Sequence, residues 1–592
     1  MTLVLILGFL LLQFLLLLLS PPHAADSLPP ASPIRCDENA GCVVSNAYGA
    51  WNDRRTECRA GSAVYPTTEA ELLSAVAASR DSKAKVATAF SHTIPKLACP
   101  QPGGNSSNGS TTSSVLISTA QYRQALEFGP ADRTVTATSG WGLREVIDAA
   151  EERGMSLAAA PYWEGVSVGG MVATGAHGSS WWGRGGAVHD AVDAVSVVVP
   201  AGCREGFAKV VRLRRGDPGF GAAVVSLGLL GVVSQVTFSL EPRFKRSITY
   251  RFQDNSSFED EFTDLARSHE FADITWYPSQ HTAVYRLDDR VPINTSGNGV
   301  NDFIGFQSNP ILVSTAVRAT EKALEKSKNI KGKCTVAKTE IAYKKLVGNG
   351  LKNEGIIFTG YPVVGYQGKM QTSGSCLHSS KADPLSMCAW DPRIKGLFFY
   401  ETTAIFAASK FKDFILDVKK LRNLNPDNFC GVDIYNGFLI RFIKSSEAYL
   451  GQNEDSVVVD FNYYRADDPL TPRLNQDVWE EVEQMAFFKH GARPHWAKNR
   501  KVAFLGVQNK YPKMDKFITE KKRFDPTGIF DSVLSDEILF GKESEKYDGC
   551  ALDGQCICSE DTHCSPSQGY LCKPGLVYQE AMVCRYTDST VQ

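Results

Sequence analysis

The stretch VGGMVATGAHGSSWWGRGG, residues 168–186, constrains the fold of this chain more than any other. It holds seven glycines, one histidine and two tryptophans. Clustered glycines mark tight turns, or backbone that must come close to another group. Neither a GxxxxGK[ST] phosphate loop nor a clean GxGxxG dinucleotide fingerprint is present. Successive bare amides can still bind an anion, so the stretch is either a ligand cradle of another geometry or a glycine-rich surface loop.

Length and charge narrow the class of protein. A chain of 592 residues exceeds what a single core supports, so we expect two large domains. Lys and Arg number 63 against 65 Asp and Glu, without a long basic run. Nothing electrostatic therefore favours a nucleic-acid partner.

The N-terminus is typical of a secreted protein. Residues 3–19 are apolar apart from Gly8 and Gln13, and small residues follow as far as Asp26. This pattern predicts a signal peptide over residues 1–25, with no stable membrane insertion after cleavage. An uncleaved anchor of about 17 residues is the alternative, because no basic residue precedes the apolar run. We expect the secretory pathway and an extracellular destination, which in a plant is the cell wall or apoplast.

Glycosylation signals and cysteines agree with an oxidising compartment. Sequons begin at Asn105, Asn108, Asn255 and Asn294. Of fifteen cysteines, six lie in the tail at residues 543–592: Cys550, Cys556, Cys558, Cys564, Cys572 and Cys584. Such density predicts a disulfide module whose pairing the spacing leaves open. Zinc is less favoured because CxxC pairs are missing, and the odd total leaves at least one cysteine outside intrachain pairing.

The first 243 residues have an α+β pattern. A capping box from Thr68 to Glu71 begins a helix, and residues 143–150 carry a second apolar helical face. Strands are expected at residues 85–88, 115–117, 135–138 and 232–240, and a hairpin from 194–199 and 210–213.

Residues 244–490 have a different pattern. Strands are expected at 247–252, 396–406, 433–443 and 457–464, with helices at 258–268, 409–422 and 476–489. This order suits a mostly antiparallel sheet with helices on one side.

Three separated regions resemble one family. They are residues 46–100 with NAYGAWNDRRTEC and SHTIPKLACP, the glycine-rich stretch with LGLLGVVSQVTFSLEP, and RPHWAKNR followed by RFDPTGIF. From about residue 45 to 540 the chain resembles the plant-type FAD-linked aldonolactone oxidases. The resemblance implies a two-domain vanillyl-alcohol-oxidase-type fold: an FAD-binding domain at 45–243, an antiparallel-sheet cap domain for the substrate at 244–490, a return to the flavin at 491–542, and the cysteine-rich tail.

The implied reaction is oxidation of L-gulono-1,4-lactone, or a related aldonolactone, at C2. The products would be L-ascorbate and hydrogen peroxide, with FAD as cofactor and molecular oxygen as acceptor. A flavin oxidase or dehydrogenase for another sugar or alditol, including a cytokinin-dehydrogenase-like enzyme, stays open. So does an inactive secreted binding protein that keeps the fold.

The resemblance also implies which residues hold FAD. His92 would carry the flavin covalently, although Ala89, Phe90 and Ser91 stand where the family often has glycines. No cysteine lies between Gly140 and His177, which argues against a second link. Pro161 stands where oxidases admit oxygen to the flavin. The full expected set is Ser91, His92, Thr93, Pro161, Gly169, Gly170, Thr174, Gly175, His177, Gly178 and Val233.

Three residues are the expected catalytic set. In the family's HWxK motif Lys498 would stabilise negative charge on the reduced flavin, and His495 lies three residues before it. Arg441 matches the arginine of an ExR motif that holds substrate, but Leu439 stands at the glutamate position. That departure leaves the exact substrate open, and the sequence does not identify the general base.

Overall fold

The computed structural model describes most of the chain after residue 33. The described residues are 34–38, 41–44, 57–87, 95–103, 114–129, 131, 133–184, 186–378, 386–388, 399–464, 466–468, 470–498, 500–542 and 546–587. The predicted signal peptide, the sequons at Asn105 and Asn108, and Ser91, His92 and Thr93 lie outside these residues.

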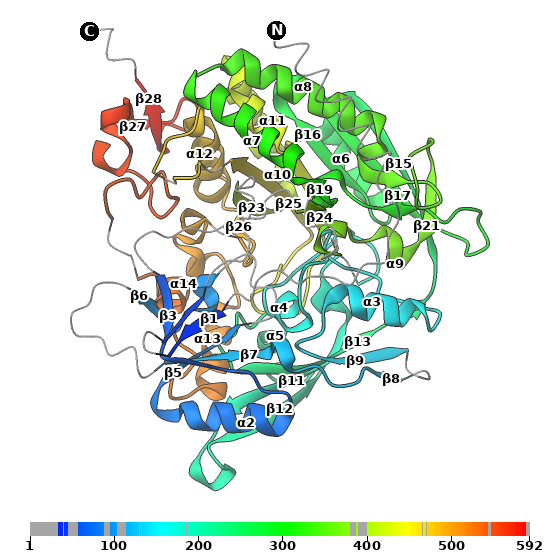
Figure 1. The fold of residues 1–592 in the computed structure, drawn as a ribbon, viewed down its shortest axis with the longest axis vertical. Coiled ribbons are helices and arrows are strands. Elements are labelled where there is room, and N and C mark those ends of the chain that lie inside the picture. Colours follow the sequence, from blue (N-terminus) through cyan, green and yellow to red (C-terminus); the bar gives the residue numbers. More distant parts are fainter. Residues whose placement is uncertain are drawn as a thin grey trace.

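Among its described residues, the first half of the chain forms three sheets of three or more strands, in the lower half of Figure 1, and one two-stranded sheet. A four-stranded antiparallel sheet has the order β1 (Ile34–Asp37), β2 (Gly41–Val44), β3 (Glu57–Ala60), β6 (Gln101–Gly103). A parallel sheet has the order β4 (Ser62–Val64), β7 (Ser114–Ser118), β5 (Lys83–Ala87). An antiparallel sheet has the order β12 (Ala208–Arg214), β11 (Val192–Pro200), β13 (Val232–Ser239), β9 (Thr134–Thr138), β8 (Glu127–Gly129).

Local signals in this half act as expected. Thr68 caps α2 (Glu69–Ala78) by accepting from the Glu71 amide, and α3 (Leu143–Glu151) buries the apolar face read from the sequence. The hairpin of β11 and β12 is confirmed. Within the glycine-rich stretch, residues Val168–Ala173 form the short helix α4, with Ser167 as its N-cap.

An eight-stranded antiparallel sheet organises the second half, in green and yellow in Figure 1. Its order is β21 (Val363–Tyr366), β15 (Lys245–Asp254), β17 (Thr282–Val291), β16 (Asp273–Tyr277), β24 (Phe438–Ile443), β25 (Ser456–Tyr464), β23 (Phe399–Ala407), β26 (Arg493–Pro494).

The two faces of this sheet differ in chemistry, because side chains alternate along each strand. One face is apolar, as with Trp276, Phe438 and Phe461, and packs against α6 (Phe258–Ser268), α10 (Ala408–Leu424) and α12 (Gln476–Gln484). The other face carries buried charges, as with Arg441 on β24 and Asp460 on β25. The expected one-sided helical cover is therefore present.

Several elements differ from the sequence expectation. The predicted strand at 433–443 is shorter: Cys430–Ile434 is helix α11, Asn436 and Gly437 turn with positive φ, and β24 begins at Phe438. Helices α7 (Ile311–Lys326) and α8 (Ile330–Leu346) were not foreseen. Helix α8 buries few large apolar residues and is fastened instead by the Cys334–Cys430 disulfide, so its hydrophobic periodicity is weak.

The end of the chain returns to the first half. Helices α13 (Met514–Phe524) and α14 (Val533–Phe540) pack in the first core, and both lie in the lower half of Figure 1. The lysines of β5 hold the segment between these helices: Lys83 Nζ donates to the Gly528 carbonyl (2.6 Å) and Lys85 Nζ to that of Phe530 (2.5 Å). The tail then crosses back to lie beside α12, in red in Figure 1.

The remaining elements are short connectors and tail strands. They are α5 (Phe220–Ala223), α9 (Gln367–Met370), β10 (Met155–Ser156), β14 (Glu241–Pro242), β18 (Val300–Asn301), β19 (Asn309–Pro310), β20 (Leu351–Lys352), β22 (Ser386–Met387), β27 (Tyr570–Pro574) and β28 (Met582–Tyr586).

Seven disulfides join fourteen of the fifteen cysteines. They are Cys36–Cys42, Cys58–Cys99, Cys334–Cys430, Cys376–Cys388, Cys550–Cys556, Cys558–Cys572 and Cys564–Cys584. The leftover cysteine required by the odd count is Cys203, which is exposed.

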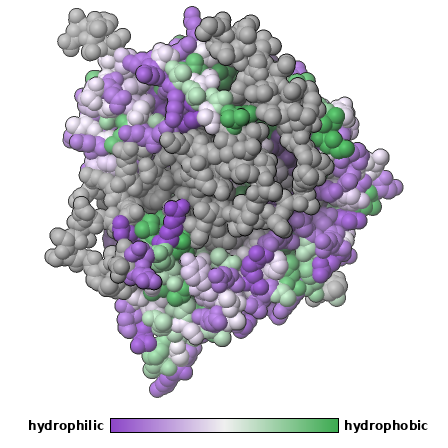
Figure 2. Space-filling model, in the orientation of Figure 1, coloured by the Kyte–Doolittle hydropathy of each residue, from purple (hydrophilic) through white to green (hydrophobic). Residues whose placement is uncertain are grey.

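On the face shown in Figure 2, hydrophilic and hydrophobic residues of the described part alternate in small groups. Among the described residues, no helix has the length and apolarity needed to cross a bilayer.

Candidate functional site

A buried group of charged side chains lies where the glycine-rich segment meets the large sheet. Three neighbouring strands contribute to one face: β24 gives Arg441, β25 gives Asp460, and β23 gives Glu401 and Thr403. The segments that meet them come from far away in the chain and carry His177, His495 and Lys498. The structure thus brings together four of the residues expected from the sequence, His177, Arg441, His495 and Lys498.

Arg441 forms an ion pair with Asp460, and both side chains are about nine-tenths buried. Asp460 also accepts a hydrogen bond from the Thr403 hydroxyl and lies 4.0 Å from Lys498 Nζ. Burial alone would raise its pKa, but the charges of Arg441 and Lys498 outweigh burial and lower it. Asp460 therefore stays ionised in the folded protein.

Asp460 was missed by sequence reasoning, although it occupies an informative place. In the antiparallel register it stands directly opposite Leu439, and opposite residues share a face of the sheet. The carboxylate absent at position 439 is thus present one strand away. Identifying Asp460 requires the register between β24 and β25, which the sequence does not reveal.

Lys498 also reaches the charged face of the large sheet, where a second carboxylate holds it. Its Nζ lies 3.3 Å from Glu401 Oε2, and both side chains are about four-fifths buried. Two carboxylates, Glu401 and Asp460, therefore fix the ammonium group beside Arg441.

The two histidines have opposite hydrogen-bonding roles. His177 Nδ1 donates to the Gly178 carbonyl (2.9 Å), so its Nε2 carries the lone pair. His495 Nδ1 accepts from the Ala497 amide (3.0 Å), so its Nε2 carries the proton. The ring centroids are 5.0 Å apart. Burial and nearby cations lower the pKa of His177 well below its usual value and that of His495 to about 3, so both rings are neutral near pH 7.

Close backbone contacts fix the glycine-rich segment against the sheet. Arg441 Nη1 donates to the His177 carbonyl (3.2 Å), and the Ser180 amide donates to the Phe442 carbonyl (2.7 Å). A Cβ at Gly178 would lie 2.7 Å from the Ala160 carbonyl. Pro161 follows Ala160 in the chain, and the next residue, Tyr162, lies under the Arg441 guanidinium.

Several buried polar atoms of this group have no partner among the described residues. They include His177 Nε2, Arg441 Nε and Asn462 Oδ1. Asn462 lies two residues from Asp460 on β25 and opposite Glu401. Buried polar atoms are normally paired, so this set of donors and acceptors suits a small ligand with several hydroxyl groups.

The expected cofactor glycines have more than one role. Gly169 lets α4 approach β9, since a Cβ there would lie 2.8 Å from that of Ser139, and Gly175 turns the chain with φ of +67°. The Thr174 hydroxyl donates to the Gly170 carbonyl, and Val233 is buried on β13. These glycines therefore serve the packing and turning of the chain, and their expected contact with FAD stays a prediction.

Groups suited to FAD nevertheless surround α4. The hydroxyls of Ser139, at its start, and Ser226, beside its end, are buried without a described partner. So is that of Thr119, whose carbonyl faces Gly140 next to Ser139. A ligand rich in hydrogen-bonding groups, such as the ribose and pyrophosphate of FAD, would satisfy such atoms. The residues present fit the cofactor.

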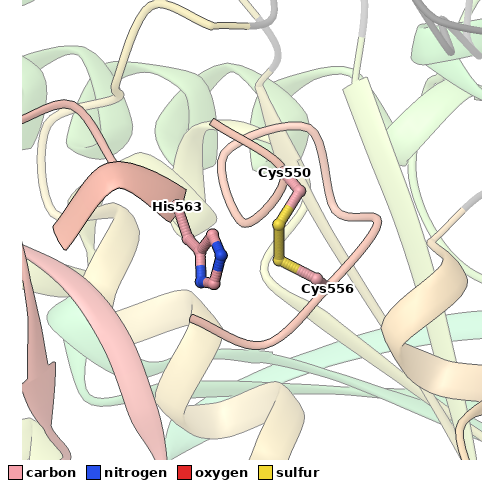
Figure 3. Close-up of side chains that lie close together, drawn as sticks. All are labelled: Cys550, Cys556 and His563. Atoms are coloured by element: carbon pink, nitrogen blue, oxygen red, sulfur yellow. A yellow bond between two sulfur atoms is a disulfide. The ribbon is translucent and has the colours of Figure 1, made fainter. Parts of the chain in front are cut away.

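The tail cysteines are not arranged as a metal site. Cys550, Cys556 and His563 lie close together, but Figure 3 shows the two sulfurs bonded to each other, with the His563 ring beside them. His563 Nδ1 accepts from the Ser559 amide (3.1 Å). The disulfide expectation for the tail is confirmed, and no described tail cysteine is left as a thiolate.

Family models match three parts of the chain. A model described as an FAD binding domain matches residues 61–204, and one described as D-arabinono-1,4-lactone oxidase matches residues 409–537. A third, the C-terminal domain of L-gulonolactone oxidase 2-like proteins, matches residues 547–586. The residues matched by the first two models include most of the buried charged group: His177 lies in the first, and Arg441, Asp460, His495 and Lys498 lie in the second.

Full-length relatives decide the family. L-gulonolactone oxidase 3 of Arabidopsis thaliana is 61% identical over 571 residues, covering 96% of both chains. The chain belongs to the L-gulonolactone oxidase family. L-gulonolactone oxidase 2 of the same plant is 47% identical over 96% of each chain. The bovine L-gulonolactone oxidase is 22% identical and covers 74% of this chain.

Solved structures agree on the fold. A solvent-stable cholesterol oxidase superposes with a TM-score of 0.64 at 15% identity, covering 87% of this chain and 100% of the other. The cholesterol oxidase of B. sterolicum gives 0.61 at 15% identity, over 88% and 100%. This L-gulonolactone oxidase family member therefore has the vanillyl-alcohol-oxidase-type fold and is an FAD-dependent oxidoreductase.

Proposed function

We propose that the protein oxidises L-gulono-1,4-lactone, or a closely related aldonolactone, with molecular oxygen to give L-ascorbate and hydrogen peroxide. The observation that carries the proposal is the buried group around Arg441, Asp460 and Lys498, which offers unpaired donors and acceptors to a polyhydroxylated ring. The names of the full-length relatives favour a lactone over another sugar or an alditol.

The chemistry divides between cofactor and protein. FAD supplies the acceptor for the hydride that leaves C2 of the lactone, and oxygen takes up the electrons as hydrogen peroxide. Arg441 and Asp460 bind ring hydroxyls and orient the reacting carbon. Lys498 places a fixed cation in the site, where it stabilises the negative charge that hydride transfer creates.

The histidines have distinct parts in this proposal. His177 presents a lone pair on Nε2 and accepts a hydrogen bond from the reacting hydroxyl. His495, whose Nε2 carries a proton, donates instead. His177 is thus the better choice as the group that receives the hydroxyl proton, a role that the sequence left open.

A product assay tests the proposed function. Purified full-length protein is supplied with FAD and a panel of lactones, sugars and alditols, and ascorbate and peroxide are both measured. We expect the two products in equal amounts from L-gulono-1,4-lactone. Lys498→Met should lower kcat by about 100-fold, while Lys419→Met, which breaks a buried pair with Glu259 on the helical side, should leave kcat within about twofold.

Other outcomes would select the alternatives. Flavin reduction by another sugar or alditol, with no turnover of any lactone, would refute the lactone assignment and favour a related oxidase. Well-folded protein that takes up no FAD would favour an inactive binding protein.

Two finer roles belong to the same proposal. The position of Pro161, between Ala160 at the glycine segment and Tyr162 under Arg441, supports a role in admitting oxygen. Pro161→Ala should slow reoxidation of the reduced flavin by oxygen and leave its reoxidation by an artificial dye unchanged. Covalent attachment at His92 should keep flavin colour with acid-precipitated protein, and His92→Ala should release it. Release from the unaltered protein would refute the link.

We also propose entry into the secretory pathway, supported by the apolar leader and the seven disulfides. The structure corrects one expected glycan: Asn255 is buried, and its side chain meets Arg422 and Trp276, so it has no room for a sugar. Asn294 is exposed. In protein expressed through the secretory pathway, Asn294→Gln should increase the gel mobility by the amount expected for the loss of one glycan. Asn255→Gln should leave the mobility unchanged.

A further inference from the structure

The C-terminal module, residues 546–587, is anchored on the acidic face of α12. Glu481 accepts hydrogen bonds from the amides of Leu576, Val577 and Tyr578 (2.6–2.9 Å). Glu480 accepts from the Cys584 amide (2.8 Å). Both glutamates are buried, so the module packs directly against the helix that covers the large sheet.

A second contact reaches the chain just after Lys498. The Gly554 carbonyl accepts from the amides of Lys501 (3.0 Å) and Val502 (3.4 Å), which begin the short 3-10 helix Lys501–Phe504. The Tyr400 hydroxyl donates to the Leu552 carbonyl (2.9 Å). The module therefore holds both the segment that follows Lys498 and the strand β23.

Arg500 connects these contacts to the site. It is 1% exposed, and its guanidinium pairs with Glu483 of α12 (2.8 Å), which also accepts from the Thr402 hydroxyl (2.8 Å). A Cβ at Gly554 would collide with Arg500 Nη1. Thr402 and Tyr400 flank Glu401 on β23, and Glu401 is the carboxylate that pairs with Lys498.

We propose that the C-terminal module is a brace that positions Lys498 in the oxidase site. It supports both partners of the Lys498–Glu401 pair from behind: Tyr400 and Thr402 lie on the opposite face of the strand from Glu401. Arg500 and Lys501 fix the chain two and three residues beyond Lys498. The inference rests on the proposed function for the consequence of the brace, but the contacts themselves are independent of it.

A matched pair of tyrosines tests the brace with the least disturbance. Tyr400 and Tyr463 both stack on Trp479, with ring centroids 5.9 and 5.6 Å away, and both donate to a backbone carbonyl. Only the acceptor of Tyr400, Leu552, belongs to the module. In the full-length holoenzyme Tyr400→Phe should lower kcat about 3- to 10-fold, and Tyr463→Phe less than twofold. Equal effects of the two variants would overturn the proposal.

A pair of glycines gives a stronger test. Gly554 and Gly569 both have positive φ in the module, but the atoms nearest to a side chain at Gly569 belong to Tyr586 and the Thr587 backbone. Gly554→Ala should lower kcat about 10- to 100-fold and speed hydrogen exchange in peptides covering residues 500–504. Gly569→Ala should do neither. Unchanged exchange and kcat in Gly554→Ala would refute the brace.

A readout without substrate separates this inference from the proposed function. Sulfite adds to oxidised flavin as an anion, so a fixed cation in the site strengthens its binding. Gly554→Ala should raise the sulfite Kd about tenfold, with no change in Gly569→Ala. If the unaltered protein oxidises no lactone, the proposed function fails while the sulfite and exchange data still decide the brace.

Discussion

At the residue scale, Asp460 places a carboxylate on the face where the family resemblance predicted one at position 439. The two positions are opposed in the register of β24 and β25, so a side chain from either reaches the same face. Arg441, on β24, pairs with the carboxylate from β25. The site therefore has a negative charge beside Arg441 even though Leu439 carries none.

Asp460→Asn should lower kcat/KM for the lactone about 100-fold, because truncating one partner of a buried charge pair costs roughly 2–5 kcal/mol. Adding Leu439→Glu to this variant should restore part of the loss, since the new carboxylate lies on the same face. Asp288→Asn is the control: this carboxylate pairs with Arg246 and Arg286 farther along the same sheet. It should lower stability and leave kcat/KM within about twofold. A loss of rate equal in both single variants would contradict the assignment.

His177 and His495 should show different tautomers. The hydrogen bonds require a proton on Nδ1 of His177 and on Nε2 of His495. Because burial lowers both pKa values, neither ring should gain charge between pH 5 and pH 8. Nitrogen-15 NMR of histidine-labelled protein, assigned with His177→Gln and His495→Gln, measures both properties. A titration of either ring in that range would count against the proposed roles.

At the scale of elements, α12 shows how acidic side chains can be buried when another segment supplies their hydrogen bonds. Its sequence QDVWEEVEQ is an amphipathic helix, which predicts a solvated acidic face. In the structure the C-terminal module covers that face, and the module's backbone amides supply the hydrogen bonds that the carboxylates need. The helix is therefore a docking element as well as a cover for the sheet.

Glu480 should make this docking depend on pH. Burial raises its pKa to about 7, although Arg500 and the Cys584 amide oppose the rise. A folded pKa above the unfolded value contributes stability that is complete below about pH 4.5 and is lost as pH rises through about 7. The shift corresponds to at most about 3 kcal/mol. The apparent unfolding temperature at a fixed scan rate should thus fall from pH 5 to pH 8.

Two variants isolate that effect. Glu480→Gln should flatten the fall, because the amide still accepts from Cys584 but does not titrate. Gln484→Leu removes a non-titrating anchor to Met582 and should lower the unfolding temperature equally at every pH. A slope unchanged by Glu480→Gln would show that Glu480 is not the group responsible.

Helices and strands with strong local signals were predictable, and those held by long-range contacts were not. The helix at 258–268 has an apolar stripe that the structure buries at the same residues. Helix α8 lacks one, since a disulfide and the Lys333–Glu325 pair fasten it. The strand expected from 433 begins five residues later, because Asn436 and Gly437 adopt positive φ that apolar periodicity does not reveal.

At the scale of the whole molecule, the site exists only because distant segments meet. Residue types and motifs identified His177, Arg441, His495 and Lys498 separately. Their distances, and the part of Asp460, depend on how the glycine-rich segment crosses the sheet and on how the chain's end returns. The fold class followed from the order of elements and the family resemblance, whereas the brace formed by the tail required the packed structure.

Gly186 should control how closely the two halves approach. A Cβ there would lie 2.8 Å from the Ser180 amide nitrogen and 3.1 Å from the Phe442 carbonyl oxygen, the donor and acceptor of a hydrogen bond between the halves. Gly186→Ala should push the segment away from β24, next to Arg441, and lower kcat/KM about 10- to 100-fold without changing FAD content. Gly202→Ala, where nothing lies within 4 Å of the new atom, should match the unaltered protein. If both variants have the same kinetics, the contact does not set the geometry of the site.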